Sequence, residues 1–178
     1  TTTLNDHFGS KTVVSGAGFL LNNEMDDFSI KEGYPNLYGV TGTAANAIAP
    51  KKIPASSMTP TLVLKDGKPT LVTGSPGGAR IITTVLQTVV NTIDFGNNPA
   101  EAAAAPRVHH QWTPDELRVE KGLSPDTLAL LKQRGHNIAV KPSMGRTQTI
   151  QIRGGTLYGY SDPRNPDGTV HQKAFAGQ

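Results

Sequence analysis

The chain has 178 residues, which is enough for one domain with a hydrophobic core of its own. Its net charge is +3, and its 17 Lys and Arg residues do not form the basic and aromatic runs of a nucleic-acid surface, so we expect no nucleic-acid partner. The absence of cysteine excludes disulfides, thiolate metal sites and a cysteine nucleophile. No apolar stretch reaches the roughly 20 residues that span a bilayer, so we expect no membrane span in this chain.

The first third of the chain predicts short strands followed by a long loop. Residues 1–5 and 12–21 carry β-branched and apolar residues interrupted by glycines, which favours two strands with tight turns. Residues 31–60 contain four prolines and three glycines with little periodicity, which predicts a long irregular connection. Such loops in compact domains are usually functional or disordered.

Three carboxylates lie within four residues between these two regions, at Glu24, Asp26 and Asp27. Like charges this close together are unfavourable unless a cation is near, and the ammonium group of a substrate would be such a cation. A calcium site is another interpretation, but the alternating acidic positions and central glycine of an EF-hand loop are missing. A solvated acidic turn is the alternative that needs no ligand.

A hairpin comes next in the chain. Residues 61–64 and 69–73 are predicted strands, and Asp66-Gly67 between them favours a tight turn with positive φ. Just before the hairpin, Ser56 and Ser57 lie between two prolines. Paired hydroxyls on such a stiffened loop can hold a carboxylate, although loop serines commonly form turns.

The second strand runs into the segment GSPGGAR, and apolar residues then recur at helical spacing from 81 to 93. Gly77 and Gly78 let backbone N–H groups approach a ligand oxygen, and the start of the helix adds positive potential. These features predict an anion or oxyanion site, with a strand-to-helix turn that needs positive φ as the alternative. We expect Arg80 to pair with a carboxylate, because the helix dipole opposes its charge.

Two shorter helices are predicted further on. Asn98, Pro99 and Glu101 form the pattern of a capping box ahead of an alanine helix that ends before Pro106. A second helix is expected between Ser124 and a C-terminal cap near residue 135.

Further strands are expected at 137–140, 147–152 and 157–160, and the tail after about residue 165 is predicted to be frayed. Strand pairs precede and follow the helical middle instead of alternating with it. We therefore predict an α+β fold and a single domain over residues 1–178. His109 and His110 cannot bind one ion together, because neighbours on a strand face opposite ways, so we interpret them as structural and expect no metal.

Eight segments carry the most specific pattern, and in chain order they are GFLLNNEMDDFS, PNLYGVTG, ANAIAP, SSMTPTLVLKDGK, LVTGSPGGARIITTVLQTVVN, APRVHHQW, PDELRVEKG and YGYSDPR. They resemble the small, C-terminal subunit of bacterial gamma-glutamyltranspeptidases. This resemblance implies an N-terminal-nucleophile hydrolase fold, an αββα four-layer sandwich completed by a large subunit that autoproteolysis releases from the same precursor. It also implies gamma-glutamyl transfer and hydrolysis of glutathione through a glutamyl-threonine intermediate, which water, amino acids or peptides resolve, without a cofactor.

The same resemblance implies residue roles. Gly77 and Gly78 correspond to the oxyanion pair, and Ser56 and Ser57 correspond to the residues that bind the α-carboxylate of the substrate. The residues around the α-ammonium group of the substrate correspond to Asn5, Glu24 and Asp27.

The first residues of the chain, Thr1 to Asn5, match the second strand of the family's small subunit. Thr3 resembles the threonine that hydrogen-bonds the nucleophile. The nucleophilic threonine is therefore expected upstream of Thr1, on a preceding segment or on another chain, and Thr1 itself is the fallback. The family also implies export to the periplasm or the medium.

Two other functions stay open at this point. One is a glutaryl or cephalosporin acylase of the same fold, against which Glu24 and Asp27 argue because a glutaryl group has no ammonium to meet them. The other is a non-catalytic, anion-binding interaction module.

Overall fold

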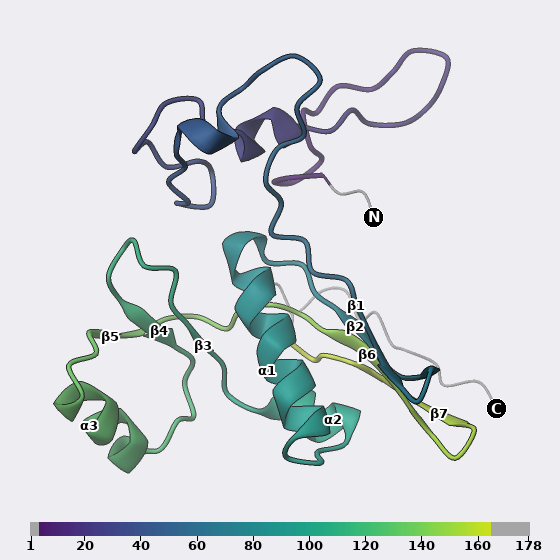
Figure 1. Ribbon diagram of the computed structural model, residues 1–178, viewed down its shortest axis with the longest axis vertical. Coiled ribbons are helices and arrows are strands. Elements are labelled where there is room, and N and C mark those ends of the chain that lie inside the picture. The colour runs from purple at the N-terminus through teal and green to yellow at the C-terminus, as the bar shows by residue number, and fades with distance from the viewer. Residues whose placement is uncertain (1–3, 165–178) are drawn as a thin grey trace. The chain divides into compact units, whose positions relative to one another are not determined.

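The computed structural model describes residues 4–164, and its contacts group the chain into two compact units, Thr1–Ser57 and Met58–Gln178 (Figure 1). Each unit is described by itself. Thr1 and Thr3 lie outside the described residues, as does the tail that the sequence predicts to be frayed. The single domain predicted over residues 1–178 stays a prediction.

The first unit consists of turns and two short 3₁₀ helices, η1 (Glu24–Asp27) and η2 (Ala44–Asn46). Of the strand with tight turns predicted over residues 12–21, only the turns are confirmed, because Val13 and Leu20 form just an isolated antiparallel bridge. The chain turns between them at Gly16 and Gly18, whose φ angles are 80° and 73°. The irregular connection predicted from residue 31 is confirmed, with η2 as its regular part.

The second unit contains an antiparallel sheet of four strands in the order β1-β2-β6-β7 (Figure 1). Its strands are β1 (Thr61–Lys65), β2 (Lys68–Gly74), β6 (Gln148–Arg153) and β7 (Thr156–Ser161). The hairpin turn between β1 and β2 is confirmed, since Asp66 and Gly67 have φ angles of 52° and 75°.

The other elements of this unit are three α-helices and a smaller sheet. They are α1 (Ile81–Ile93), α2 (Pro99–Ala104), α3 (Pro125–Gln133), β3 (Val108–His109), β4 (Leu117–Val119) and β5 (Ile138–Val140). The predicted capping box of α2 is present, because Asn98 and Glu101 exchange hydrogen bonds at its start. Among the described residues, no helix is both long and apolar enough to cross a bilayer.

The two faces of the four-stranded sheet differ in burial. The face toward α1 and α2 buries Leu71, Thr73 and Thr149 almost completely. The opposite face carries four large aliphatic side chains on neighbouring strands, each of them 39–57% exposed. They are Leu62, Val72, Ile150 and Leu157. We call this row the apolar sheet face. The mixture of sheets and segregated helices confirms the predicted α+β class.

Four charged side chains, Arg107, Glu120, Asp162 and Arg164, form a buried ion network in the second unit. Arg107 is 2% exposed and places Nη2 2.5 Å from Oδ2 of Asp162, while Nη2 of Arg164 lies 2.9 Å from Oε2 of Glu120. Burial by itself would raise the pKa of Asp162, but backbone N–H donors and the Arg107 guanidinium hold that pKa below its usual value. The network is therefore well compensated.

The ion network also fixes a loop that reaches back toward α1. Arg107 donates from Nη1 to the carbonyl oxygen of Met144 at 2.8 Å, and the Met144 N–H donates to Oε1 of Glu120 at 2.6 Å. Met144 is only 2% exposed. Both backbone groups of this residue are thus held by buried charges, which restricts the following residues.

We expect Asp162→Ala to lower the free energy of unfolding by about 3–5 kcal/mol, because it leaves the buried Arg107 charge without its partner. Urea unfolding at neutral pH measures this loss. Since the folded-state pKa of Asp162 is lowered, its contribution is complete above the unfolded pKa and is lost as the pH falls through the folded value. Asp115→Ala is the matched control, because that side chain is 93% exposed and should cost far less. Equal losses in both variants would contradict the expectation.

Candidate functional site

The first candidate group is built on η1. A 3₁₀ helix has three residues per turn, so Glu24 and Asp27 project from the same side and their carboxyl groups share a hydrogen bond. Asp26 projects elsewhere, and its Oδ2 accepts the N–H of Leu37 at 2.8 Å. The acidic segment therefore divides into a close pair, Glu24 and Asp27, and a separate carboxylate.

Asn5 joins this pair from a distant part of the chain, as the sequence predicts. It is 5% exposed and donates from Nδ2 to Oδ1 of Asp27 at 2.9 Å. The hydroxyl of Tyr38 donates to Oδ1 of Asn5 at 3.1 Å and accepts the N–H of Asp6 at 3.3 Å. These bonds orient the Asn5 amide with its NH₂ group toward the acids. We call Asn5, Glu24, Asp27 and Tyr38 the acidic cradle.

The acidic cradle has more negative charge than its donors compensate. Burial, followed by the hydrogen bond and charge of Asp27, raises the pKa of Glu24 from 4.5 to about 7. Burial also raises the pKa of Tyr38, and the charges of Asp27 and Glu24 add to the effect. Oε1 of Glu24 is buried and has no hydrogen-bond partner among the described residues. A bound cation with N–H donors would satisfy both the charge and this oxygen.

Asn46 ties the acidic cradle to the predicted serine pair within the same unit. Its Nδ2 donates to the carbonyl oxygen of Asp27 at 2.7 Å, and its Oδ1 accepts the N–H of Ala55 at 2.9 Å. Ala55 immediately precedes Ser56, which is exposed, and Ser57, which is half-buried. One amide side chain thus brings together the segments that carry the predicted ammonium and carboxylate receptors.

The second candidate group is the glycine loop between β2 and α1, residues 75–78. Gly77 and Gly78 have φ angles of 145° and 58°, so this backbone favours glycine at both positions. Gly78 begins the 3₁₀ turn η3 (Gly78–Arg80), which leads directly into the 13 residues of α1. The helix dipole therefore adds positive potential at the point where the two glycines meet the helix.

The residues after Met144 support this loop. Oγ of Ser75 accepts the Arg146 N–H at 2.9 Å and donates to the carbonyl oxygen of Pro76 at 2.7 Å. Gly145 has a φ of 67°, and a Cβ atom there would lie 2.6 Å from Thr84 and 2.9 Å from Ser75. The close approach requires glycine at 145, a position that sequence reasoning did not single out.

The ion pair expected of Arg80 is not formed with any residue between 4 and 164. Among the described residues Arg80 has no carboxylate partner, and its buried Nε has no hydrogen bond. Burial lowers the pKa of His109, and the positive charge of Arg80 adds to this effect. That histidine is held by Thr83 at 2.7 Å and Gln111 at 2.9 Å, which confirms its structural interpretation. No group of three or more acidic or histidine side chains within residues 4–164 is arranged to hold a metal ion.

The family resemblance grouped Asn5, Glu24 and Asp27, and the structure brings these three together. Sequence reasoning missed Tyr38 and Asn46. Tyr38 lies in a turn and Asn46 ends η2, and the local sequence at both carries no signal for a long-range contact. The roles of the predicted site residues stay predictions, including those of Thr1 and Thr3 outside the described part of the chain.

Comparison with known proteins places this geometry in a family. The gamma-glutamyltranspeptidase family model matches residues 1–171. The glutathione hydrolase proenzyme of Escherichia coli K12 is 63% identical over 168 residues, which are 94% of this chain and 29% of that relative. The chain therefore spans about three tenths of the length of this relative.

Solved structures agree with the sequence match. A Helicobacter pylori gamma-glutamyltranspeptidase mutant superposes with a TM-score of 0.88 at 55% identity, covering 93% of this chain and 91% of that one. The Pseudomonas nitroreducens gamma-glutamyltranspeptidase complexed with L-DON gives a TM-score of 0.83 at 46% identity, covering 93% and 88%. The fold is that of the N-terminal-nucleophile hydrolases, as predicted. The chain belongs to the gamma-glutamyltranspeptidase family.

The raised pKa of Glu24 generates a pH-dependence prediction. Because the folded-state pKa lies above the unfolded value of 4.5, the contribution of Glu24 to stability is present below 4.5 and is lost as the pH rises through about 7. Unfolding by urea between pH 4.5 and 8 should show this fall in wild type but not in Glu24→Gln. The exposed Glu32→Gln variant is the control and should behave as wild type. A Glu24→Gln protein with the wild-type pH profile would show that Glu24 is not perturbed.

Proposed function

We propose that this chain is the small-subunit part of an enzyme that transfers and hydrolyses gamma-glutamyl groups of glutathione and related compounds. The acidic cradle carries this proposal, since its unsatisfied, buried carboxylate oxygen matches the α-ammonium group of a glutamyl donor. Membership of the gamma-glutamyltranspeptidase family supports the same activity.

The other predicted residues receive roles in this reaction. Ser56 and Ser57 would bind the α-carboxylate of the donor, and the N–H groups of Gly77 and Gly78 would stabilise the oxyanion formed at the γ-carbonyl. A threonine hydroxyl attacks that carbonyl, the amide C–N bond breaks, and the leaving amine takes the proton that the threonine loses. Water or an amino-acid amine then cleaves the glutamyl ester and returns a proton to the threonine. The nucleophilic threonine is proposed to precede Thr1, and Thr1 itself is the alternative nucleophile. Thr3 is proposed to form a hydrogen bond with the nucleophile.

The rival functions are less well supported. A glutaryl donor has no ammonium group, so it would leave Glu24 and Asp27 facing each other without a cation. A non-catalytic, anion-binding module would fit the glycine loop, but it would depart from the hydrolases and transpeptidases to which the chain is similar.

We expect Asp27→Ala to weaken binding of gamma-glutamyl-4-nitroanilide by about 2–5 kcal/mol, because the donor ammonium loses a half-buried charge partner. Release of 4-nitroaniline by the assembled enzyme measures this effect as a rise in KM. The glutaryl analogue lacks the ammonium, so the variant should not be impaired toward it. Asp26→Ala is the matched control, since its carboxylate lies outside the acidic cradle. Normal donor affinity in Asp27→Ala would refute the assignment.

The large subunit of the same precursor is the proposed partner. The apolar sheet face supports this, because four exposed aliphatic side chains on one face of a sheet need a covering layer. This chain spans only 29% of the related Escherichia coli proenzyme. The remaining part of such a precursor is therefore the candidate for the covering layer. A periplasmic or secreted location is proposed on the family resemblance alone.

Val72→Lys should weaken assembly with the large subunit by at least about tenfold, because it places a charge in the centre of the apolar sheet face. Size-exclusion chromatography after co-expression of the whole precursor measures the fraction assembled. Val13→Lys changes an exposed valine of the first unit, 61% exposed against 39% for Val72, and serves as the control. Full assembly of Val72→Lys would exclude this face from the interface.

A further inference from the structure

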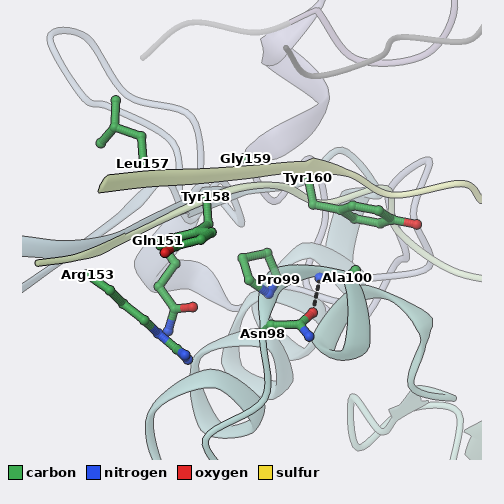
Figure 2. A pocket seen from close by; sticks show the side chains of 9 residues that line it. All are labelled: Asn98, Pro99, Ala100, Gln151, Arg153, Leu157, Tyr158, Gly159 and Tyr160. Carbon is green, nitrogen blue, oxygen red and sulfur yellow. Dashed lines mark hydrogen bonds between the residues drawn. The ribbon is translucent and has the colours of Figure 1, made fainter. Parts of the chain in front are cut away.

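A pocket in the second unit has no role in the function proposed above. It lies between the start of α2 and the strands β6 and β7, and Figure 2 shows the side chains that surround it. Its cavity volume of about 470 Å³ falls within the range of small-molecule sites. The pairing of Gln151 with Tyr158 and of Thr149 with Tyr160 puts both tyrosines on the helix-facing side of the sheet, beside the pocket.

The amide of Gln151 faces this pocket. Gln151 lines the pocket, and its side chain is only 7% exposed. Figure 2 shows its amide projecting from β6 into the space below Tyr158. A primary amide offers two N–H donors and one C=O acceptor, so Gln151 can form hydrogen bonds with a ligand that binds there.

The charge of the pocket selects the chemistry of that ligand. Arg153 follows Gln151 by two residues on β6, so the guanidinium and the amide belong to the same side of the strand. None of the described residues that line the pocket is acidic. The nearest acid along the chain, Glu101, is already bonded to the N–H of Asn98 at 2.8 Å. A guanidinium fork next to an amide donor matches a carboxylate.

The walls of the pocket select the shape of the ligand. Tyr158, Tyr160 and Pro99 present rings to the cavity, and Leu157 points away from it in Figure 2. Aromatic and proline rings pack well against flat, apolar groups. The cavity thus offers a polar end at Gln151 and Arg153 and a ring-lined end at the two tyrosines.

We propose that this pocket binds a small carboxylate with a flat, apolar body, such as an aromatic acid of about amino-acid size. The carboxylate pairs with Arg153 and takes a hydrogen bond from the amide of Gln151, while the body lies against the tyrosine rings. This binding goes beyond gamma-glutamyl transfer and does not depend on it, since it involves none of the residues assigned to that reaction.

The test uses 3-(4-fluorophenyl)propionate as the probe and the assembled two-subunit enzyme as the protein. Fluorine NMR should show saturable binding of the carboxylate and at least about tenfold weaker binding of the corresponding amide, because the amide cannot form the charge-assisted pair. Arg153→Gln and Gln151→Leu should each weaken binding of the carboxylate by about tenfold or more. Arg134→Gln, at an exposed position after α3, is the matched control and should bind as wild type.

Three results would overturn the proposal. They are equal binding of acid and amide, full binding by Arg153→Gln, and absence of binding to the assembled enzyme, which would mean that the partner subunit fills the pocket. Release of 4-nitroaniline from gamma-glutamyl-4-nitroanilide is measured in parallel, and Arg153→Gln should leave it unchanged. That assay reports on the transfer activity separately, so failure of one proposal does not imply failure of the other.

Discussion

The first unit holds the carboxylates of Glu24 and Asp27 close together with few hydrogen-bond donors around them. The function proposed for this unit depends on that constraint. Glu24 and Asp27 meet because η1 has three residues per turn, and Asn5 keeps Asp27 in place through a 2.9 Å hydrogen bond. Their repulsion is relieved either by a shared proton, which the raised pKa of Glu24 describes, or by an ammonium ion. The same charge repulsion thus accounts for the raised pKa of Glu24 and supports the binding of an amine that we propose.

In the second unit, a buried ion network constrains the backbone that supports the glycine loop. Buried charges hold both backbone groups of Met144, the next residue packs closely on Thr84 and Ser75, and Ser75 belongs to the glycine loop. The geometry of that loop therefore depends on an ion network whose residues lie far from it along the chain. A buried ion pair adds little net stability by itself, so its contribution here is better understood as fixing one conformation of the loop.

Both units contain groups that other described residues do not cover or pair. Within residues 4–164 the apolar sheet face has no covering layer, and Oε1 of Glu24 in the acidic cradle has no hydrogen-bond partner. A chain that spans three tenths of a related proenzyme is expected to show such faces, because burial and charge compensation are properties of the whole assembly. The pocket below Tyr158 differs from them, since its polar and ring-lined ends suit a small ligand.

The sequence by itself determined the local elements of this protein. Asp66-Gly67 specified the hairpin turn, and Asn98 and Glu101 specified the cap of α2. The spacing of apolar residues specified the length of α1. All three features depend on neighbours within a few residues. It also indicated the acid pair and the glycine loop. Only the tertiary structure decided that Tyr38 orients Asn5, that Gly145 supports the loop and that Arg80 lacks a carboxylate. Those outcomes depend on contacts between residues far apart in sequence, for which local composition has no periodic signal.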